Sequence, residues 1–135
     1  MNLIWIKNIE DETRSNTTFR TALWTGKHSQ LTVMSLGPGE EIGLEVHPNV
    51  DQFLRLEEGR ARVEIGASQE DLSETYDAEE DWAFIVPAGT WHNVINTGDG
   101  NLKLYTIYSP PNHPAGTVHA TKADADAAEP AEREG

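Results

Sequence analysis

The clearest pattern along the chain is the strict alternation of apolar and polar residues in the segment RARVEIG, residues 60–66. Ala61, Val63 and Ile65 share one face of an extended segment, while arginine and glutamate side chains occupy the other face. The segment QFLRLEE, residues 52–58, alternates in a similar way. Gly59 separates the two segments at a position where a tight turn often requires a positive φ angle. We therefore predict a β-hairpin over residues 52–65.

Further apolar segments separated by turn residues predict additional strands. They cover residues 3–9, 19–25, 29–36, 82–89, 91–96 and 102–109. No convincing long helix is predicted before the tail. Many short strands at close spacing indicate an all-β fold, either an antiparallel barrel or a two-sheet sandwich. In such a fold alternate side chains point into one interior, so residues far apart in sequence can meet there.

The length of 135 residues suits one domain with a single core. We place this domain at residues 1–114. Residues 115–135 are rich in alanine with scattered acidic residues, and we expect them to form a flexible tail with at most a short helix. Removal of the chain from Lys122 onward is therefore expected to leave the stability nearly unchanged.

The charge narrows the choice of partners. The chain carries 23 acidic and 10 basic residues, a formal net charge of −13. Such a charge repels phosphate backbones and anionic lipid surfaces, which argues against a nucleic-acid or membrane partner. No window approaches the ~20 consecutive apolar residues of a membrane span. Residues 67–81 hold seven acids and no base, and we expect them to form a solvated loop.

Cysteine is absent from the chain. Disulfides, thiolate metal sites and cysteine nucleophiles are therefore excluded, and the composition fits a cytoplasmic protein. Any metal ion must be held by nitrogen and oxygen ligands.

Two segments carry polar side chains at a specific spacing. The first is GEEIGLEVHPNVDQFLRLEEG, residues 39–59, and the second is DWAFIVPAGTWHNVIN, residues 81–96. They resemble the two motifs of the cupin superfamily, G-x5-H-x-H-x(3 to 4)-E-x6-G and G-x5-P-x-G-x2-H-x3-N, with Asp81 in place of the first glycine of the second motif. The resemblance implies a small single-domain cupin, whose fold is a double-stranded β-helix, a jelly-roll-like antiparallel barrel.

The resemblance also implies a divalent metal ion held at the family's ligand positions, here Glu45, His47, Gln52 and His92. Glu45 replaces a histidine of the family pattern and Gln52 replaces its glutamate, so the charge of the ligand set is unchanged. Buried polar groups that converge in an apolar barrel would be left unpaired without a bound ion. This donor set leaves Zn²⁺, Mn²⁺, Fe²⁺ and Ni²⁺ open. Asp51 is an alternative to Gln52, but it lies out of register with Gly59.

Three residues are candidates for proton transfer: Glu45, Tyr105 and Tyr108. The two tyrosines lie on opposite faces of one predicted strand, so one of them should face the interior, where it could pack in the core or serve as a proton donor.

Other polar and aromatic residues have less defined roles. His28, His113 and His119 lie in turn-like or tail segments, and we expect them on the surface. Trp91 could border the mouth of a pocket or fill an intersubunit surface. Arg55 is predicted to lie opposite Gln52, at an interface or a second sheet.

Cupins include isomerases, epimerases, decarboxylases, dioxygenases and proteins that only bind ligands, so the fold leaves three functions open. The first is Lewis-acid chemistry on a small polar carbonyl or sugar-like substrate, of the isomerase, epimerase or lyase type. The second is a non-haem Fe(II) dioxygenase, and the third is a small-molecule-binding protein without turnover. The neutral Gln52 favours the first over the second.

We also predict a homodimer from the sequence. The segment at residues 3–9 is apolar enough to need cover from a partner.

Overall fold

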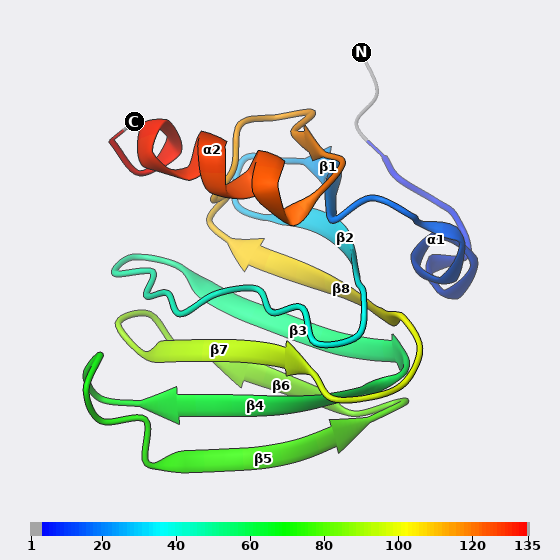
Figure 1. Cartoon of the computed structure of the whole chain (residues 1–135). Coiled ribbons are helices and arrows are strands. Elements are labelled where there is room, and N and C mark those ends of the chain that lie inside the picture. The colour runs from blue at the N-terminus through cyan, green and yellow to red at the C-terminus, as the bar shows by residue number, and fades with distance from the viewer. Residues whose placement is uncertain (1–3, 135) are drawn as a thin grey trace.

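The computed structural model describes residues 4–134 and contains two antiparallel β-sheets. Figure 1 shows the sheets and the two flanking helices. The six-stranded sheet has the order β6-β3-β8-β2-β1-β9, and the three-stranded sheet has the order β5-β4-β7. The strands are β1 (Arg20–Thr25), β2 (Gln30–Leu36), β3 (Asp51–Glu58), β4 (Arg60–Gly66), β5 (Glu74–Glu79), β6 (Ala83–Val86), β7 (Trp91–Asn96), β8 (Leu102–Ser109) and β9 (Val118–His119). The all-β prediction is confirmed.

The predicted hairpin is formed by β3 and β4, which meet at Gly59. This glycine has a φ angle of 98°, a conformation that side-chain-bearing residues rarely adopt. A Cβ atom there would also lie 3.0 Å from the carbonyl oxygen of Asn101. Both the turn and the close approach of the β7–β8 connection therefore require glycine at this position.

The inward side chains of β3, β8 and β2 form layers that change from polar to apolar along the barrel. At one end, Gln52, Tyr108 and Gln30 pair across the three strands. The next layer contains Leu54, Thr106 and Thr32, with the two threonine hydroxyls 3.2 Å apart. The third layer is apolar and contains Leu56, Leu104 and Met34.

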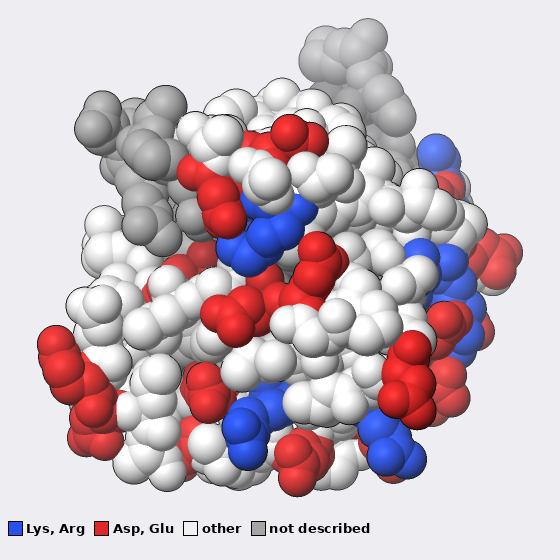
Figure 2. All heavy atoms as spheres, in the orientation of Figure 1, with Lys and Arg blue, Asp and Glu red and all other residues white. Residues whose placement is uncertain are grey.

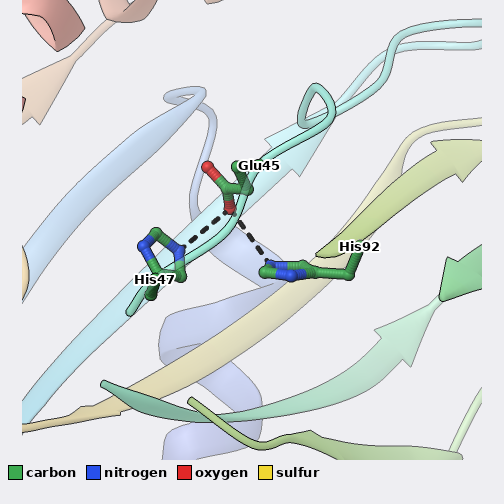
Figure 3. A group of neighbouring side chains, drawn as sticks. All are labelled: Glu45, His47 and His92. Atoms are coloured by element: carbon green, nitrogen blue, oxygen red, sulfur yellow. Dashed lines mark ion pairs between the residues drawn. The ribbon is translucent and has the colours of Figure 1, made fainter. Parts of the chain in front are cut away.

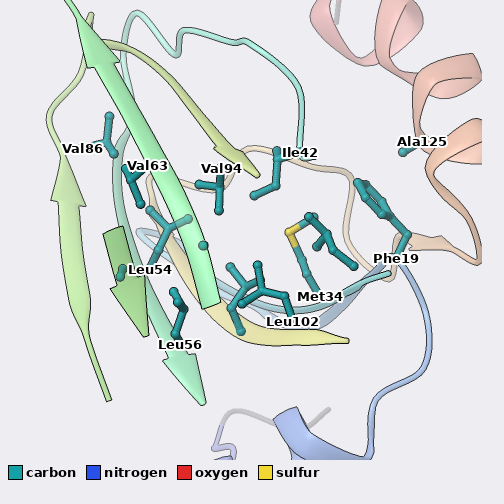
Figure 4. Close-up of a cluster of buried hydrophobic side chains, with 14 residues drawn as sticks. Phe19, Met34, Ile42, Leu54, Leu56, Val63, Val86, Val94, Leu102 and Ala125 are labelled. Atoms are coloured by element: carbon teal, nitrogen blue, oxygen red, sulfur yellow. The ribbon is translucent and has the colours of Figure 1, made fainter. Parts of the chain in front are cut away.

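The apolar end is the main core, between the two sheets (Figure 4). Val63 of β4 and Val94 of β7 pack there against the layers of the larger sheet. Alternation along β3 and β4 thus sends one set of side chains into a common interior, as the sequence pattern predicts.

The prediction of a strand at residues 3–9 is wrong for the described part of the chain. Residues 4–8 are not in a strand, and helix α1 spans Ile9–Ser15. Asn8 caps this helix, because its side chain accepts a hydrogen bond from the backbone N–H of Asp11. Three acidic residues in the first turn also favour a helix there, Glu10, Asp11 and Glu12.

The acidic segment at residues 67–81 is not wholly a loop, because it contains β5. β5 pairs with β4 along its full length, from Arg60–Glu79 to Ile65–Glu74. Ala78 packs in the core, whereas the other side chains of the strand are exposed. A strand with one outward face tolerates the acidic residues that favoured a loop in the sequence.

The tail also differs from the expectation of a loose segment. β9 pairs with β1, and helix α2 spans Lys122–Glu134. Thr121 and Asp124 exchange side-chain to backbone hydrogen bonds at the start of α2. Ala125 is only 2% exposed and belongs to the same core cluster as Phe19. Among residues 4–134, no helix is long and apolar enough to cross a membrane.

Candidate metal centre

The segment before β3 runs beside β7 and brings Glu45 to His92. The two residues form an isolated antiparallel bridge, in which each backbone N–H donates to the other residue's carbonyl at 3.0 Å. Gly43 interrupts the segment with a φ angle of 109°, and its N–H donates to the side-chain oxygen of Asn93 at 2.9 Å. The segment is therefore held in register with β7 without forming a continuous strand.

His47 is fixed by the turn that precedes β7. Its carbonyl oxygen accepts a hydrogen bond from the N–H of Gly89, at 2.9 Å. Gly89 has a φ angle of 82°, which explains why the turn after Pro87 uses glycine. The two motifs found in the sequence are thus connected by backbone hydrogen bonds on both sides of the site.

Three of the four predicted ligands converge, as Figure 3 shows. The Oε1 atom of Glu45 lies 3.3 Å from Nε2 of His47 and 3.4 Å from Nε2 of His92. The three ligand atoms lie within 4.8 Å of one another, a spacing that could hold one metal ion. Glu45 and His92 are buried, and the side chain of His47 is 12% exposed.

The hydrogen bond on the far side of the His92 ring shows which ring nitrogen carries a proton. It therefore also shows that the other nitrogen presents a lone pair to Glu45. Nδ1 of His92 lies 3.0 Å from the carbonyl oxygen of Thr90, which can only accept. Nδ1 must therefore carry a proton, and in the neutral ring Nε2 has none. A lone pair then faces the carboxylate of Glu45, an unfavourable contact unless a cation lies between the two atoms. That cation is either a proton or a metal ion.

Two opposing effects act on the pKa of the Glu45 carboxyl group. Burial opposes its ionisation, but the nearby His47 and His92 side chains outweigh this effect and hold its pKa well below the usual range. A carboxyl group with a lowered pKa is suited to act as a negatively charged oxygen donor to a cation.

Gln52 and Gln30 flank Tyr108 in neighbouring strands, yet their side-chain amides differ in hydrogen bonding. Oε1 of Gln30 accepts from the backbone N–H groups of Asn112 and His113, and its Nε2 donates to the carbonyl of His113 and to the hydroxyl of Thr25. By contrast, Oε1 of Gln52 is buried and has no hydrogen-bond partner. Gln30 is a structural residue, whereas Gln52 presents an unused oxygen to the interior.

We call the four predicted ligands the interior cluster: Glu45, His47, Gln52 and His92. In the described part of the chain, five buried side-chain nitrogen or oxygen atoms have no hydrogen-bond partner, and four of them belong to this cluster. Buried polar atoms rarely remain unpaired in native proteins, and the atoms of Glu45, His47 and His92 also converge, which indicates a site for a ligand. The fifth atom is Nε of Arg20.

Asp51, the alternative ligand, is exposed at the start of β3. Its carboxylate accepts a hydrogen bond from the N–H of Ala88 at 2.9 Å. This contact gives Asp51 a structural role in the turn before β7.

The structure separates the two tyrosines. Tyr108 is 1% exposed and its ring meets that of His47 edge-on, with centroids 5.9 Å apart. Burial raises the pKa of the Tyr108 phenol, although the neighbouring Arg20 acts in the opposite direction. Tyr105 lies on the outer face of the sheet, where its ring is 6.1 Å from that of Phe53. Only Tyr108 is near the interior cluster.

The surface prediction is correct for His28 but wrong for His113 and His119, which are buried. The rings of His113 and Tyr108 meet edge-on with centroids 5.2 Å apart, and Nδ1 of His119 lies 3.2 Å from a guanidinium nitrogen of Arg20. His113 follows β8 at the end where Tyr108 lies, a position that could have indicated a place near the site. Arg55 lies on the outer face and forms ion pairs with Glu57 and Asp81.

A cavity of about 640 Å³ adjoins the interior cluster. Glu45 and His47 are among the residues that line it, together with Trp91 and His113. The volume lies within the range of ordinary small-molecule sites, about 300–1,000 Å³. The arrangement therefore combines a candidate metal site with space for a small ligand beside it.

Comparison with known proteins gives consistent matches. A family model described as "Cupin domain" matches residues 32–108. The chain is 65% identical over 125 residues to the protein YrkC of Bacillus subtilis (strain 168), with 93% of this chain and 67% of that protein covered. It is 40% identical over 118 residues to protein L612 of Acanthamoeba polyphaga mimivirus, with 87% and 72% covered.

Solved structures show the same architecture. The crystal structure of BH2720 from Bacillus halodurans is 58% identical in sequence and superposes with a TM-score of 0.90, covering 91% of this chain and 93% of that chain. The structure of TT1209 from Thermus thermophilus, at 22% identity, superposes with a TM-score of 0.65 and covers 78% of this chain and 96% of that one. The second match supports the fold alone.

Proposed function

The chain belongs to the cupin family, and from this premise we propose that its interior cluster holds one divalent metal ion that binds a small polar ligand. The observation that carries the proposal is the group of four unpartnered buried atoms in the cluster. Two imidazole nitrogens, one carboxylate oxygen and one amide oxygen form a donor set suited to Zn²⁺, Mn²⁺, Fe²⁺ or Ni²⁺.

We propose Lewis-acid chemistry on a small carbonyl or sugar-like substrate, of the isomerase, epimerase or lyase type. A metal ion at the cluster would polarise a substrate oxygen. The cavity beside the cluster provides space for such a molecule. Glu45 would serve as a ligand and could also accept a proton. Tyr108 would retain its proton at neutral pH, because burial raises its pKa, and so it would act as a donor rather than a base.

A second candidate is an Fe(II) dioxygenase, because the converging trio of Glu45, His47 and His92 consists of two histidines and one carboxylate. Non-haem iron oxygenases use the same ligand types with open coordination positions. Gln52 favours the first candidate, since a neutral oxygen donor would leave the metal ion electrophilic, which suits Lewis-acid chemistry. If neither activity is found, the barrel would be a small-molecule-binding protein.

Elemental analysis of protein purified without a metal-affinity tag tests the proposal. We expect about one equivalent of a divalent metal per chain, retained through gel filtration. Bound iron together with oxygen consumption would favour the dioxygenase, whereas zinc, manganese or nickel would favour Lewis-acid chemistry. If no metal is bound after incubation with each of the four ions, a proton shared between Glu45 and the histidines explains the cluster, and the proposal fails.

We also propose a cytoplasmic homodimer. Ile6 at 84% exposure and Ile85 of β6 at 65% are large apolar side chains that a partner could cover. Light scattering at micromolar concentration would contradict the dimer if it gave the mass of a single chain.

A further inference from the structure

The rim of the cavity has a chemical character of its own. Besides the backbone and apolar groups, three carboxamide side chains and one indole line it: Asn49, Gln69, Asn112 and Trp91. A carboxamide both donates and accepts hydrogen bonds, so it suits hydroxyl groups, which do the same. An indole offers a flat apolar face that can pack against the C–H groups of a sugar ring. The rim therefore matches a polyhydroxylated molecule.

Away from the candidate metal site, the charges around the cavity argue against a ligand that carries an anionic group. Glu45, His47 and His113 are the ionisable residues among those described as lining it, and none of the lining residues is lysine or arginine. Sites that recognise carboxylates or phosphates usually contain such residues, because a guanidinium or ammonium group replaces the water lost from the anion. The chain is also strongly acidic, and acidic side chains are spread over the face seen in Figure 2. An anion would therefore approach against the field of the protein.

One wall of the cavity is held rigidly from inside the barrel. Gln30, which is fully buried, forms hydrogen bonds of 2.8–3.1 Å with backbone groups of Asn112 and His113. This amide fixes the backbone of Asn112, which lines the same cavity as Glu45 and His47. A fixed wall loses little entropy on binding and can therefore select among ligands by their hydrogen bonds.

From this arrangement we propose that the cavity accepts a neutral polyhydroxylated ligand, a sugar or a sugar-like hydroxy-carbonyl compound, and discriminates against its phosphorylated or carboxylated analogues. The inference rests on the proposed function, since it concerns the ligand of the same metal site. It narrows that function to an uncharged substrate class.

The test compares two probes, D-ribose and D-ribose 5-phosphate, on the full-length protein loaded with Zn²⁺. Saturation-transfer NMR titrations give the dissociation constant of each, and elemental analysis of the same sample gives its zinc content. We expect D-ribose to bind at least about tenfold more tightly than the phosphate, because the rim offers hydrogen bonds and no cation. Equal or tighter binding of the phosphate, or no binding of D-ribose, overturns the inference.

A matched pair of variants locates the effect. Gln69→Lys places a positive charge at the rim on an exposed side chain, and it should shift the preference toward the phosphate by about fivefold or more. Asn101→Lys makes the same change in charge at an exposed position in the turn between β7 and β8, and it should leave the preference unchanged. If both variants shift the ratio of the two dissociation constants equally, the net charge of the protein sets the preference and the rim does not. The inference then fails.

The outcomes separate this inference from the proposed function. A sample that binds no zinc contradicts the metal site itself. A sample that holds zinc and prefers the phosphate leaves the metal site intact and overturns only the neutral ligand.

Discussion

The two ends of the barrel interior are built from the same strands but satisfy their side chains in different ways. At the apolar end, Leu56, Leu104 and Met34 are fully buried and need only contact with one another. Two layers away, Gln52 lies in a polar end whose cluster atoms have no hydrogen-bond partner. The difference supports our proposal that the polar end holds a ligand, while the apolar end stabilises the fold.

Gln30 shows that a buried side chain at the polar end can form all of its hydrogen bonds. It lies in the same layer as Gln52, yet all its amide atoms form hydrogen bonds. The fold can therefore satisfy a buried amide at this depth. Among the described side chains, the unpartnered buried atoms are confined to residues at the predicted ligand positions, apart from Arg20.

The largest expected effect is at the polar end, where His92→Ala should abolish stoichiometric metal binding. The change removes a buried nitrogen ligand, and no neighbouring side chain replaces it among the residues described as grouped there. Elemental analysis after gel filtration measures the loss. His28→Ala, an exposed histidine, is the control and should keep full occupancy. Full occupancy in His92→Ala would contradict the ligand assignment.

At the apolar end, Leu56→Ala should reduce the free energy of unfolding by about 2–5 kcal/mol, because it leaves a cavity in a packed layer. Metal stoichiometry of the folded protein should stay the same. Urea unfolding monitored by circular dichroism measures the first quantity and elemental analysis the second. Loss of metal at unchanged secondary structure would show that the two ends are coupled.

Within the polar end, charge should matter more than the loss of a neutral oxygen. Glu45→Gln removes the single negative charge of the cluster at nearly constant shape, and it should weaken metal affinity about tenfold more than Gln52→Ala does. Water can partly replace the amide oxygen of Gln52. Gln52→Glu should tighten binding. Competition titrations with a chromogenic chelator rank the three variants, and a larger loss in Gln52→Ala would reverse the assignment of the charged ligand.

The smallest effect is expected from the tail, which lies outside both ends. Truncation before Lys122 was expected from sequence to be neutral, but Ala125 packs in the core beside Phe19. Removal of α2 should therefore lower the free energy of unfolding by about 1 kcal/mol, through lost apolar contact. Thermal unfolding of the truncated and full chains measures it. An unchanged melting temperature would support the original expectation.

The strands of the barrel could be predicted because their signal is local. Alternation in residues 60–66 and the glycine at position 59 specify the hairpin without reference to the rest of the chain. The candidate ligand residues could be named because the spacing of two motifs carries them, and three of the four converge in the structure. Ile4 and Ile6 suggested a strand, but the cap formed by Asn8 and the acidic turn that follows favour a helix.

The burial of His113 could not be predicted in this way. It depends on hydrogen bonds from Gln30, which lies 83 residues earlier in the chain. The same holds for the burial of Ala125. This residue reaches the core because β9 pairs with β1 just before α2 begins. Contacts of this kind depend on the folded topology and leave no periodic signal in sequence.

β5 has a consequence for how copies of this protein behave in concentrated solution. It is the edge strand of the smaller sheet, and its free side presents backbone N–H and C=O groups that could pair with another molecule. Glu74, Asp77 and Glu79 place three carboxylates along this short strand. Carboxylates on two such edges repel each other, which opposes the extension of a sheet from one molecule to the next.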